Sequence, residues 1–187
     1  MSEIIFNPTS EIFNKDINIE YKEAEDNITQ EFEMIVENKW INLSTFLLGD
    51  YNLENILAAT KTALSLGVKE NVIVEVLRKF KNLAGRFQVV ANDRGFRTVV
   101  DFAHTEQGVR SVLSMVKEHL QKSDERMIAV FGCNGERDQT KRAPMGKVAC
   151  GLADLVVVTT EDPRREPVEQ IYRQIEEGCV ASGGIKD

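Results

Sequence analysis

The sequence lacks several features that would assign it to a class at once. None of its apolar runs approaches the roughly 20 residues that a membrane-spanning helix needs. Its first residues have neither the basic start nor the apolar core of a secretory signal. No stretch reads Gly-x-x-x-x-Gly-Lys-Ser/Thr, the loop that cradles phosphates in many nucleotide-dependent enzymes. These absences favour a cytoplasmic protein that has no membrane partner and no phosphate-binding loop of its own.

Cysteine is scarce as well. The three cysteines, Cys133, Cys150 and Cys179, are odd in number and do not have the spacing of metal ligands. We expect a reduced cytosolic protein without a metal site of its own. The net charge of -7 arises in residues 1–48, and the remainder is balanced. This distribution argues against nucleic acid as a partner.

The chain has 187 residues, of which 42% are hydrophobic and 28% charged, enough for one medium or two small globular domains. Residues 1–16 show no period and predict a loose lead-in. Apolar alternation over 17–43 predicts strands with a hairpin turn at Glu37-Asn38-Lys39. Helical spacing follows over 53–66, with Gly67 as a cap, and over 73–80.

From residue 97 the pattern alternates between strand and helix. Apolar runs at 97–102, 127–131 and 155–159 are each followed by a segment of helical periodicity. Short apolar strands separated by helices predict an α/β fold whose parallel sheet is covered on both faces. A domain boundary is expected near residues 82–88.

Polar loops follow each of these three strands. They are 101–105, 132–142 and 159–165, and they carry acidic and basic residues together with a histidine. Ligands of parallel α/β sheets bind outside the carboxyl ends of the strands. We therefore expect the three loops to meet at one edge and to bind an anionic or zwitterionic ligand.

Each loop also has a purely structural interpretation. Asp101 and Thr105 would cap the following helix, and His104 would be a structural histidine. The run from Asp138 to Arg142 would be a solvated, self-paired set of charges. Glu161, Asp162 and Arg164 would cap a helix that begins at Pro163. Only the shared position of the loops favours function.

Five segments, in order along the chain, resemble motifs of one family, the Mur ligases, and above all the tripeptide synthases of peptidoglycan assembly. They are Leu48-Gly49-Asp50-Tyr51-Asn52-Leu53-Glu54-Asn55 with Ala58-Ala59; Gly85-Arg86-Phe87; Asp101-Phe102-Ala103-His104-Thr105; the loop with Arg137, Asp138, Lys141, Arg142, Met145 and Gly146; and Thr160-Glu161-Asp162-Pro163-Arg164. The resemblance covers residues 30–180. It implies that 1–84 are the remnant of a central ATPase domain and 85–187 a Rossmann-like carboxy-terminal domain truncated at its end.

The resemblance also implies an activity. Such a ligase uses ATP and Mg²⁺ to activate the carboxylate of UDP-MurNAc-dipeptide as an acyl phosphate, which the amine of diaminopimelate or lysine then attacks. We expect a monomer, and no catalytic or metal-binding residue is assigned within this chain. By the same resemblance, Asn52, Asn55, Arg86, Asp101 and His104 would bind the nucleotide. The expected substrate contacts are Arg137, Asp138, Lys141, Arg142, Glu161, Asp162 and Arg164.

Departures from the family pattern limit these expectations. Asp162 stands where diaminopimelate-adding enzymes carry Asn, so diaminopimelate and lysine both stay open. The family's own phosphate loop, its UDP-sugar domain and its Gly-Lys-Gly-His-Glu segment have no counterpart here. We expect a fragment truncated at both ends that has no ligase activity alone. The alternatives are a non-catalytic nucleotide- or amino-acid-binding remnant and a ligase of the folylpolyglutamate or cyanophycin synthetase type.

Overall fold

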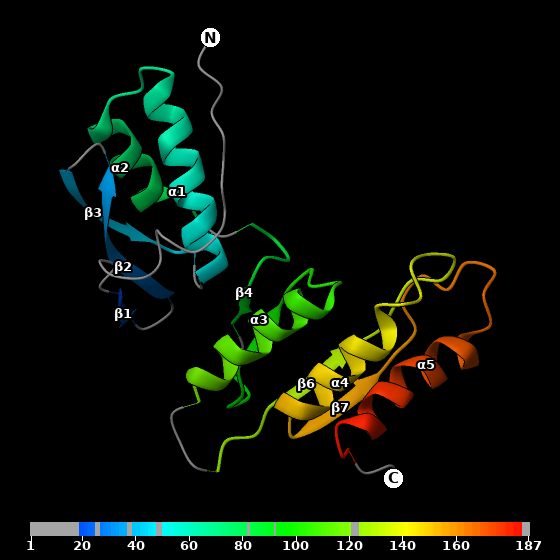
Figure 1. Ribbon diagram of the computed structural model, residues 1–187. Helices are drawn as coiled ribbons and strands as arrows, with labels where there is room; N and C mark the ends of the chain where they lie inside the picture. The colour runs from blue at the N-terminus through cyan, green and yellow to red at the C-terminus, as the bar shows by residue number, and fades with distance from the viewer. Residues whose placement is uncertain are drawn as a thin grey trace. The chain divides into compact units, whose positions relative to one another are not determined.

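The computed structural model describes residues 19–24, 27–36, 39–47, 50–81, 83–91, 93–120 and 124–184. Predictions for residues 1–16, for the Glu37-Asn38 turn and for Leu48-Gly49 lie outside the described residues. The chain divides into two compact units, residues 1–100 and 101–187 (Figure 1). The predicted boundary between residues 84 and 85 stays a prediction. No helix of the described part is long and apolar enough to cross a bilayer.

The first unit contains an antiparallel sheet of order β1-β2-β3, formed by Ile19–Ala24, Asn27–Val36 and Lys39–Thr45. Val36 pairs with Lys39, which confirms the predicted hairpin but places Lys39 in the strand. Two helices follow, α1 (Asp50–Ser65) and α2 (Glu70–Lys79). The core joins the sheet to α1, and its buried members are Phe32, Ile41, Leu43, Leu53, Ile56 and Leu57.

The structure corrects the prediction for the strand at 97–102. Its regular part, β5 (Thr98–Val100), pairs antiparallel with β4 (Gln88–Val90) in a separate two-stranded sheet. A strand-helix-strand rhythm cannot reveal this hairpin, because the partner strand precedes β5 and is only three residues long. The loop at 101–105 therefore does not leave the parallel sheet described here.

The second unit has the order α3 (Glu106–Glu118), β6 (Ile128–Phe131), α4 (Arg142–Leu152), β7 (Leu155–Val158) and α5 (Val168–Ala181). β6 and β7 are parallel, which confirms the α/β class. The core draws on α3, β6, α4 and α5, and its buried members include Val109, Leu113, Ala129, Met145, Val148, Ile171 and Ile175.

Only one face of the β6–β7 pair packs on this core. Ala129 is buried, whereas its neighbours Ile128 and Val130 are 60% and 63% exposed, and Leu155 and Val157 of β7 are also exposed. The expectation of a sheet covered on both faces is therefore wrong for the described residues. The three helices of this unit cover one face of the two strands. Because side chains alternate along a strand, every second residue points to the uncovered face.

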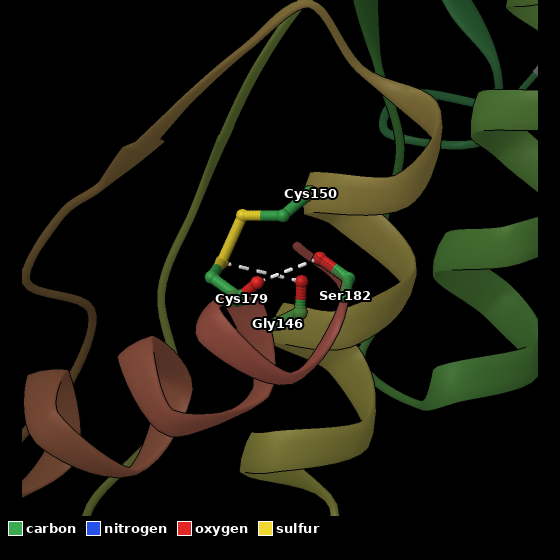
Figure 2. The surroundings of a disulfide bond; sticks show 4 residues. All are labelled: Gly146, Cys150, Cys179 and Ser182. Atoms are coloured by element: carbon green, nitrogen blue, oxygen red, sulfur yellow. Dashed lines mark hydrogen bonds between the residues drawn. A yellow bond between two sulfur atoms is a disulfide. The ribbon is translucent and has the colours of Figure 1, made fainter. Parts of the chain in front are cut away.

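α4 and α5 approach each other closely at two glycines. A Cβ on Gly146 would collide with the carbonyl oxygen of Ile175, and one on Gly178 would collide with that of Ala143. Near this contact a disulfide joins Cys150 of α4 to Cys179 of α5 (Figure 2). Two of the three cysteines are thus paired, contrary to the expectation of reduced thiols. The number and spacing of the cysteines cannot reveal this pair, because helix packing brings together residues 29 positions apart.

Candidate functional site

Two of the three predicted loops emerge side by side. In the parallel register Phe131 pairs with Val158, the last residues of β6 and β7. The segments that follow, 132–141 and 159–167, therefore leave the sheet at the same edge and lead into α4 and α5 (Figure 1). We call them the α4 loop and the α5 loop. The prediction that three loops meet at one edge of the parallel sheet is confirmed for these two and is wrong for 101–105, which follows β5 of another sheet. The site is built around the α4 and α5 loops.

The two loops touch through their backbones. A Cβ on Gly132 would collide with the carbonyl oxygen of Thr159, and one on Gly135 with that of Pro163. The N–H of Gly135 donates to Asp162 O at 2.8 Å. Only glycine permits such an approach. Both glycines therefore set the separation of the loops.

A buried ion pair between the start of α4 and the α5 loop stabilises this arrangement. Arg142, the first residue of α4, is 0% exposed. Its Nη1 and Nη2 donate to Glu166 Oε1 and Oε2 at 2.5 and 2.8 Å, a bidentate contact with the α5 loop. The guanidinium also donates to Asn134 O at 2.9 Å and to Gln174 Oε1 of α5 at 2.6 Å. The pair thus links the two loops and the two helices.

Glu166 also accepts bonds from the α4 loop itself. The N–H of Glu136 donates to its Oε2 at 2.9 Å, and Gln139 Nε2 donates to its Oε1 at 3.2 Å. The bonds from Arg142 and then from Glu136 hold the pKa of the Glu166 carboxyl at about 2, against an ordinary 4.5. The bond to Glu166 in turn raises the pKa of Arg142. The pair is therefore charged across the whole physiological range.

Each loop contains a residue in a conformation that side chains rarely adopt. Glu136 has φ 53° and Arg164 has φ 50°, both in the left-handed region. Such residues cost about 1–2 kcal/mol each and persist only where their surroundings hold them. The backbone bonds of Gly135 and Glu136 supply that restraint next to the predicted contact Arg137.

The charged side chains that we predicted as substrate contacts differ in their exposure and bonding. Arg137, Asp138, Glu161 and Asp162 are exposed. Asp138 Oδ1 accepts from the hydroxyl and the N–H of Thr140 at 2.6 and 2.9 Å, bonds that lower the pKa of Asp138. This side chain shapes a turn and does not pair with Lys141 or Arg142 in the way that a self-paired run would.

The α5 loop does not begin a helix at its proline. α5 starts at Val168, with Pro167 at the N-cap, so Pro163 lies within the loop. The capping interpretation of Glu161, Asp162 and Arg164 is therefore wrong. Arg164 Nε instead lies 3.4 Å from Asp162 Oδ2 in an ion pair at the loop surface. An ion pair of this kind contributes little to stability and leaves the guanidinium accessible.

The segment before α3 reaches the α4 loop at one point. Lys141 Nζ donates to His104 O at 2.9 Å. The hydroxyl of Thr105 accepts from Gly108 N at 3.1 Å and caps α3, whereas Asp101 Oδ1 accepts from Ala103 N at 2.8 Å and does not cap the helix. The imidazole of His104 is exposed beside Phe102.

The remaining predicted nucleotide contacts lie in the first unit. Asn52 and Asn55 are on α1, where Asn52 is buried and Asn55 is exposed, with Asn55 Nδ2 3.5 Å from Asn52 Oδ1. Arg86 is exposed and follows Gly85 at the entry to β4. The structure thus groups the two asparagines with each other, and the two loops with each other.

The sequence interpretation missed Glu166, Gln139 and Gln174. Glu166 follows Arg164-Arg165 and looks like one member of a solvated charge cluster. Its partner lies 24 residues earlier, so no local spacing signals the pair. Across the described ranges, no group of three His, Cys, Asp or Glu side chains is placed to hold a metal ion.

A family model described as Mur ligase, glutamate ligase domain, matches residues 85–186. A UDP-N-acetylmuramoyl-L-alanyl-D-glutamate–2,6-diaminopimelate ligase from Fusobacterium nucleatum is 38% identical over 136 residues, covering 73% of this chain and 28% of the relative. The ligase of the same name from Halalkalibacterium halodurans is 38% identical over 148 residues, covering 79% and 30%. The chain thus spans less than a third of the length of these relatives.

A solved structure supports the fold alone. The crystal structure of MurF from Acinetobacter baumannii aligns with 88% of this chain and 34% of its own, with a TM-score of 0.64 and 17% identity. The family model covers more than half of the chain and includes both loops of the site. The chain belongs to the Mur ligase family.

Proposed function

We propose that this chain supplies nucleotide- and amino-acid-binding parts of a cytoplasmic ligase that adds diaminopimelate to UDP-MurNAc-dipeptide in peptidoglycan synthesis. The observation that carries the proposal is the fixed pair of loops at the edge of β6 and β7. Arg137, Lys141 and Arg164 place three cations on these loops. An amino acid with two carboxylates suits such a set, because a guanidinium binds a carboxylate with two parallel hydrogen bonds.

Diaminopimelate is favoured over lysine for two reasons. Both amino acids carry an ammonium at the distal carbon, and diaminopimelate carries a carboxylate there as well. Arg164 would pair with that carboxylate, whereas lysine would present only its cation to the guanidinium. The relatives in Fusobacterium nucleatum and Halalkalibacterium halodurans are named as diaminopimelate ligases. In our proposal Asp162 orients Arg164 through the ion pair at 3.4 Å and accepts from the ammonium of the incoming amino acid.

The nucleotide contacts belong to the same proposal. Asn52 and Asn55 offer amides that donate to and accept from an adenine edge, and Asp101 offers a carboxylate to ribose hydroxyls. ATP would supply the phosphoryl group that activates the peptide carboxylate, and Mg²⁺ would neutralise its phosphates. Since no phosphate loop occurs in these 187 residues, we propose that the chain alone binds its ligands without turnover.

Calorimetric titration tests the amino-acid assignment. The chain is titrated with meso-diaminopimelate and with lysine, and phosphate release from ATP and UDP-MurNAc-dipeptide is followed in parallel. We expect tighter binding of diaminopimelate and no release of phosphate above background. Arg164→Lys should weaken binding of diaminopimelate roughly tenfold, because a point charge replaces a bidentate fork.

Arg165→Lys is the matched control, since Arg165 is the adjacent exposed arginine and the change is identical. Equal loss of affinity in both variants would refute a specific role for Arg164. If the chain binds ATP but binds neither diaminopimelate nor lysine, the result would point to a nucleotide-binding remnant. Amino-acid-dependent release of phosphate would contradict the proposal of an inactive chain.

A further inference from the structure

Glu166 occupies the junction of the two loops. Its side chain is 7% exposed, and its carboxylate accepts four bonds that leave neither oxygen free for a ligand. The four bonds come from three donor residues that lie on or just after the α4 loop, namely Glu136, Gln139 and Arg142. This single carboxylate therefore ties the α5 loop to most of the length of the α4 loop.

Arg142 is as inaccessible as its partner. Its guanidinium is 0% exposed and bonds to Glu166, Gln174 and Asn134. A cation held in this way is neutralised and turned away from solvent, so it cannot meet a substrate carboxylate. The neighbouring Lys141 is half-buried, and Arg137 is exposed. Of the three cations near the start of α4, Arg142 is the one without a surface for a ligand.

We propose that Glu166 and Arg142 are positioning residues, whose ion pair holds Arg137 on the α4 loop and Arg164 on the α5 loop at the separation that one dicarboxylic amino acid spans. The inference rests on the proposed function, because it names what sets the geometry of that site. It also reassigns Arg142 from substrate contact to support.

The local geometry distinguishes this role from general stabilisation. Glu136 donates its N–H to Glu166 while in the left-handed conformation, and it immediately precedes Arg137. A second bond, from Gly135 N to Asp162 O, also joins the two loops. Gly135 immediately precedes Glu136 on the α4 loop, and Asp162 lies two residues before Arg164 on the α5 loop. The core residues Val148, Ile171 and Ile175 pack without contributing to this network. Losing the ion pair should release the loops first.

The test combines affinity with local order in the full 187-residue chain. Glu166→Gln keeps the shape of the side chain but replaces a charged acceptor by an amide. We expect it to raise the Kd for meso-diaminopimelate roughly tenfold. Amide hydrogen exchange at Gly135 and Glu136 should accelerate by a similar factor, while exchange at Ile171 and Ile175 stays as in the unmodified chain. Glu177→Gln, at an exposed position of α5, should change neither quantity.

A second variant guards against loss of folding. Glu166→Asp keeps the charge but shortens the reach to Arg142, and it should fall between Glu166→Gln and the unmodified chain in both measurements. An unchanged Kd in the folded variants overturns the positioning role while the proposed function stands. Equal acceleration at Glu136 and Ile175 also overturns it, since that is the signature of a merely structural residue. If the unmodified chain binds no diaminopimelate, the proposed function fails, and the positioning role fails with it.

Discussion

Single residues of the second unit carry charge in two different settings. Asp138 is exposed and accepts bonds from Thr140, within its own turn. Glu166 is nearly buried and accepts from a cation that contacts no solvent. An exposed acid can be replaced at small cost, whereas removing one member of a buried pair leaves an uncompensated charge, at a cost of about 3–5 kcal/mol. The second setting therefore makes the unit sensitive to pH.

We predict that the free energy of unfolding falls as the pH drops from about 4.5 towards 2. The folded pKa of Glu166 is about 2 and its ordinary value is 4.5, so the unfolded chain takes up the proton first. The stabilising effect of the ion pair is complete above the ordinary pKa and is lost as the pH approaches the folded one. Denaturant titrations between neutral pH and pH 2.5 measure this slope.

Glu166→Gln should flatten that slope, and Glu177→Gln should leave it unchanged. Equal slopes in the chain and in Glu166→Gln would contradict the assignment of the ion pair as the acid-sensitive contact.

Residue-level prediction succeeded where the partner was local. Thr105 was a candidate cap, and its hydroxyl does bond to Gly108, three residues away. Arg142 was expected at the substrate because its loop resembles a substrate-binding motif of the Mur ligases. Its burial follows from its bonds to Glu166 and Gln174, which the packing of α4 on α5 brings within reach, together with the bond to Asn134 of its own loop. Spacing within the sequence carries no information about such a contact.

Among the elements, α4 and α5 show how glycine determines the approach of two helices. Gly178 faces the backbone of Ala143 at a distance that no side chain permits, whereas Gly151 of the same helix pair has open space around it. The two positions offer opposite outcomes for the same substitution.

We predict that Gly178→Ala destabilises the chain by about 1–3 kcal/mol, because the helices must separate to admit a methyl group. Gly151→Ala should instead stabilise it by roughly 0.5–1 kcal/mol, since alanine loses less entropy than glycine in a helix. Denaturant-induced unfolding followed by circular dichroism measures both. Stabilisation by both substitutions would show that the helices are not in backbone contact.

Periodicity predicted the helices and the two parallel strands, because each uses a repeat within one segment. It failed for β5, whose antiparallel partner β4 is too short to show a period. Parallel geometry was enough to predict that the loops after β6 and β7 leave the same edge of the sheet. It could not predict that the loop at 101–105 follows a strand of another sheet.

At the scale of the whole molecule, the buried apolar side chains of the described residues form two hydrophobic cores. One is formed by residues between Phe32 and Leu57, and the other by residues between Val109 and Ile175. Neither buried cluster includes a residue from the other unit. Each unit therefore has the apolar interior that independent folding requires.

We predict that residues 101–187 fold when expressed alone. Amide chemical shifts of Ile171 and Ile175 should match those in the full chain, because their contacts lie within this unit. The exposed apolar side chains of Ile128, Val130 and Leu155 should make the fragment bind a hydrophobic dye such as anilinonaphthalene sulfonate. Collapsed, poorly dispersed shifts in the fragment would contradict the division into units.

The disulfide between Cys150 and Cys179 makes the stability of the helix pair depend on the redox conditions of the solution. Closing a loop of this length removes disorder from the unfolded chain, a contribution on the order of 3–4 kcal/mol. Dithiothreitol should lower the unfolding free energy by that order, and the double variant Cys150→Ser with Cys179→Ser should not respond to it. Equal stability with and without reductant would contradict the disulfide. In the cytoplasm thiols are kept reduced, so there the glycine contacts, the shared core and the bonds of Arg142 would have to hold the two helices without a covalent link.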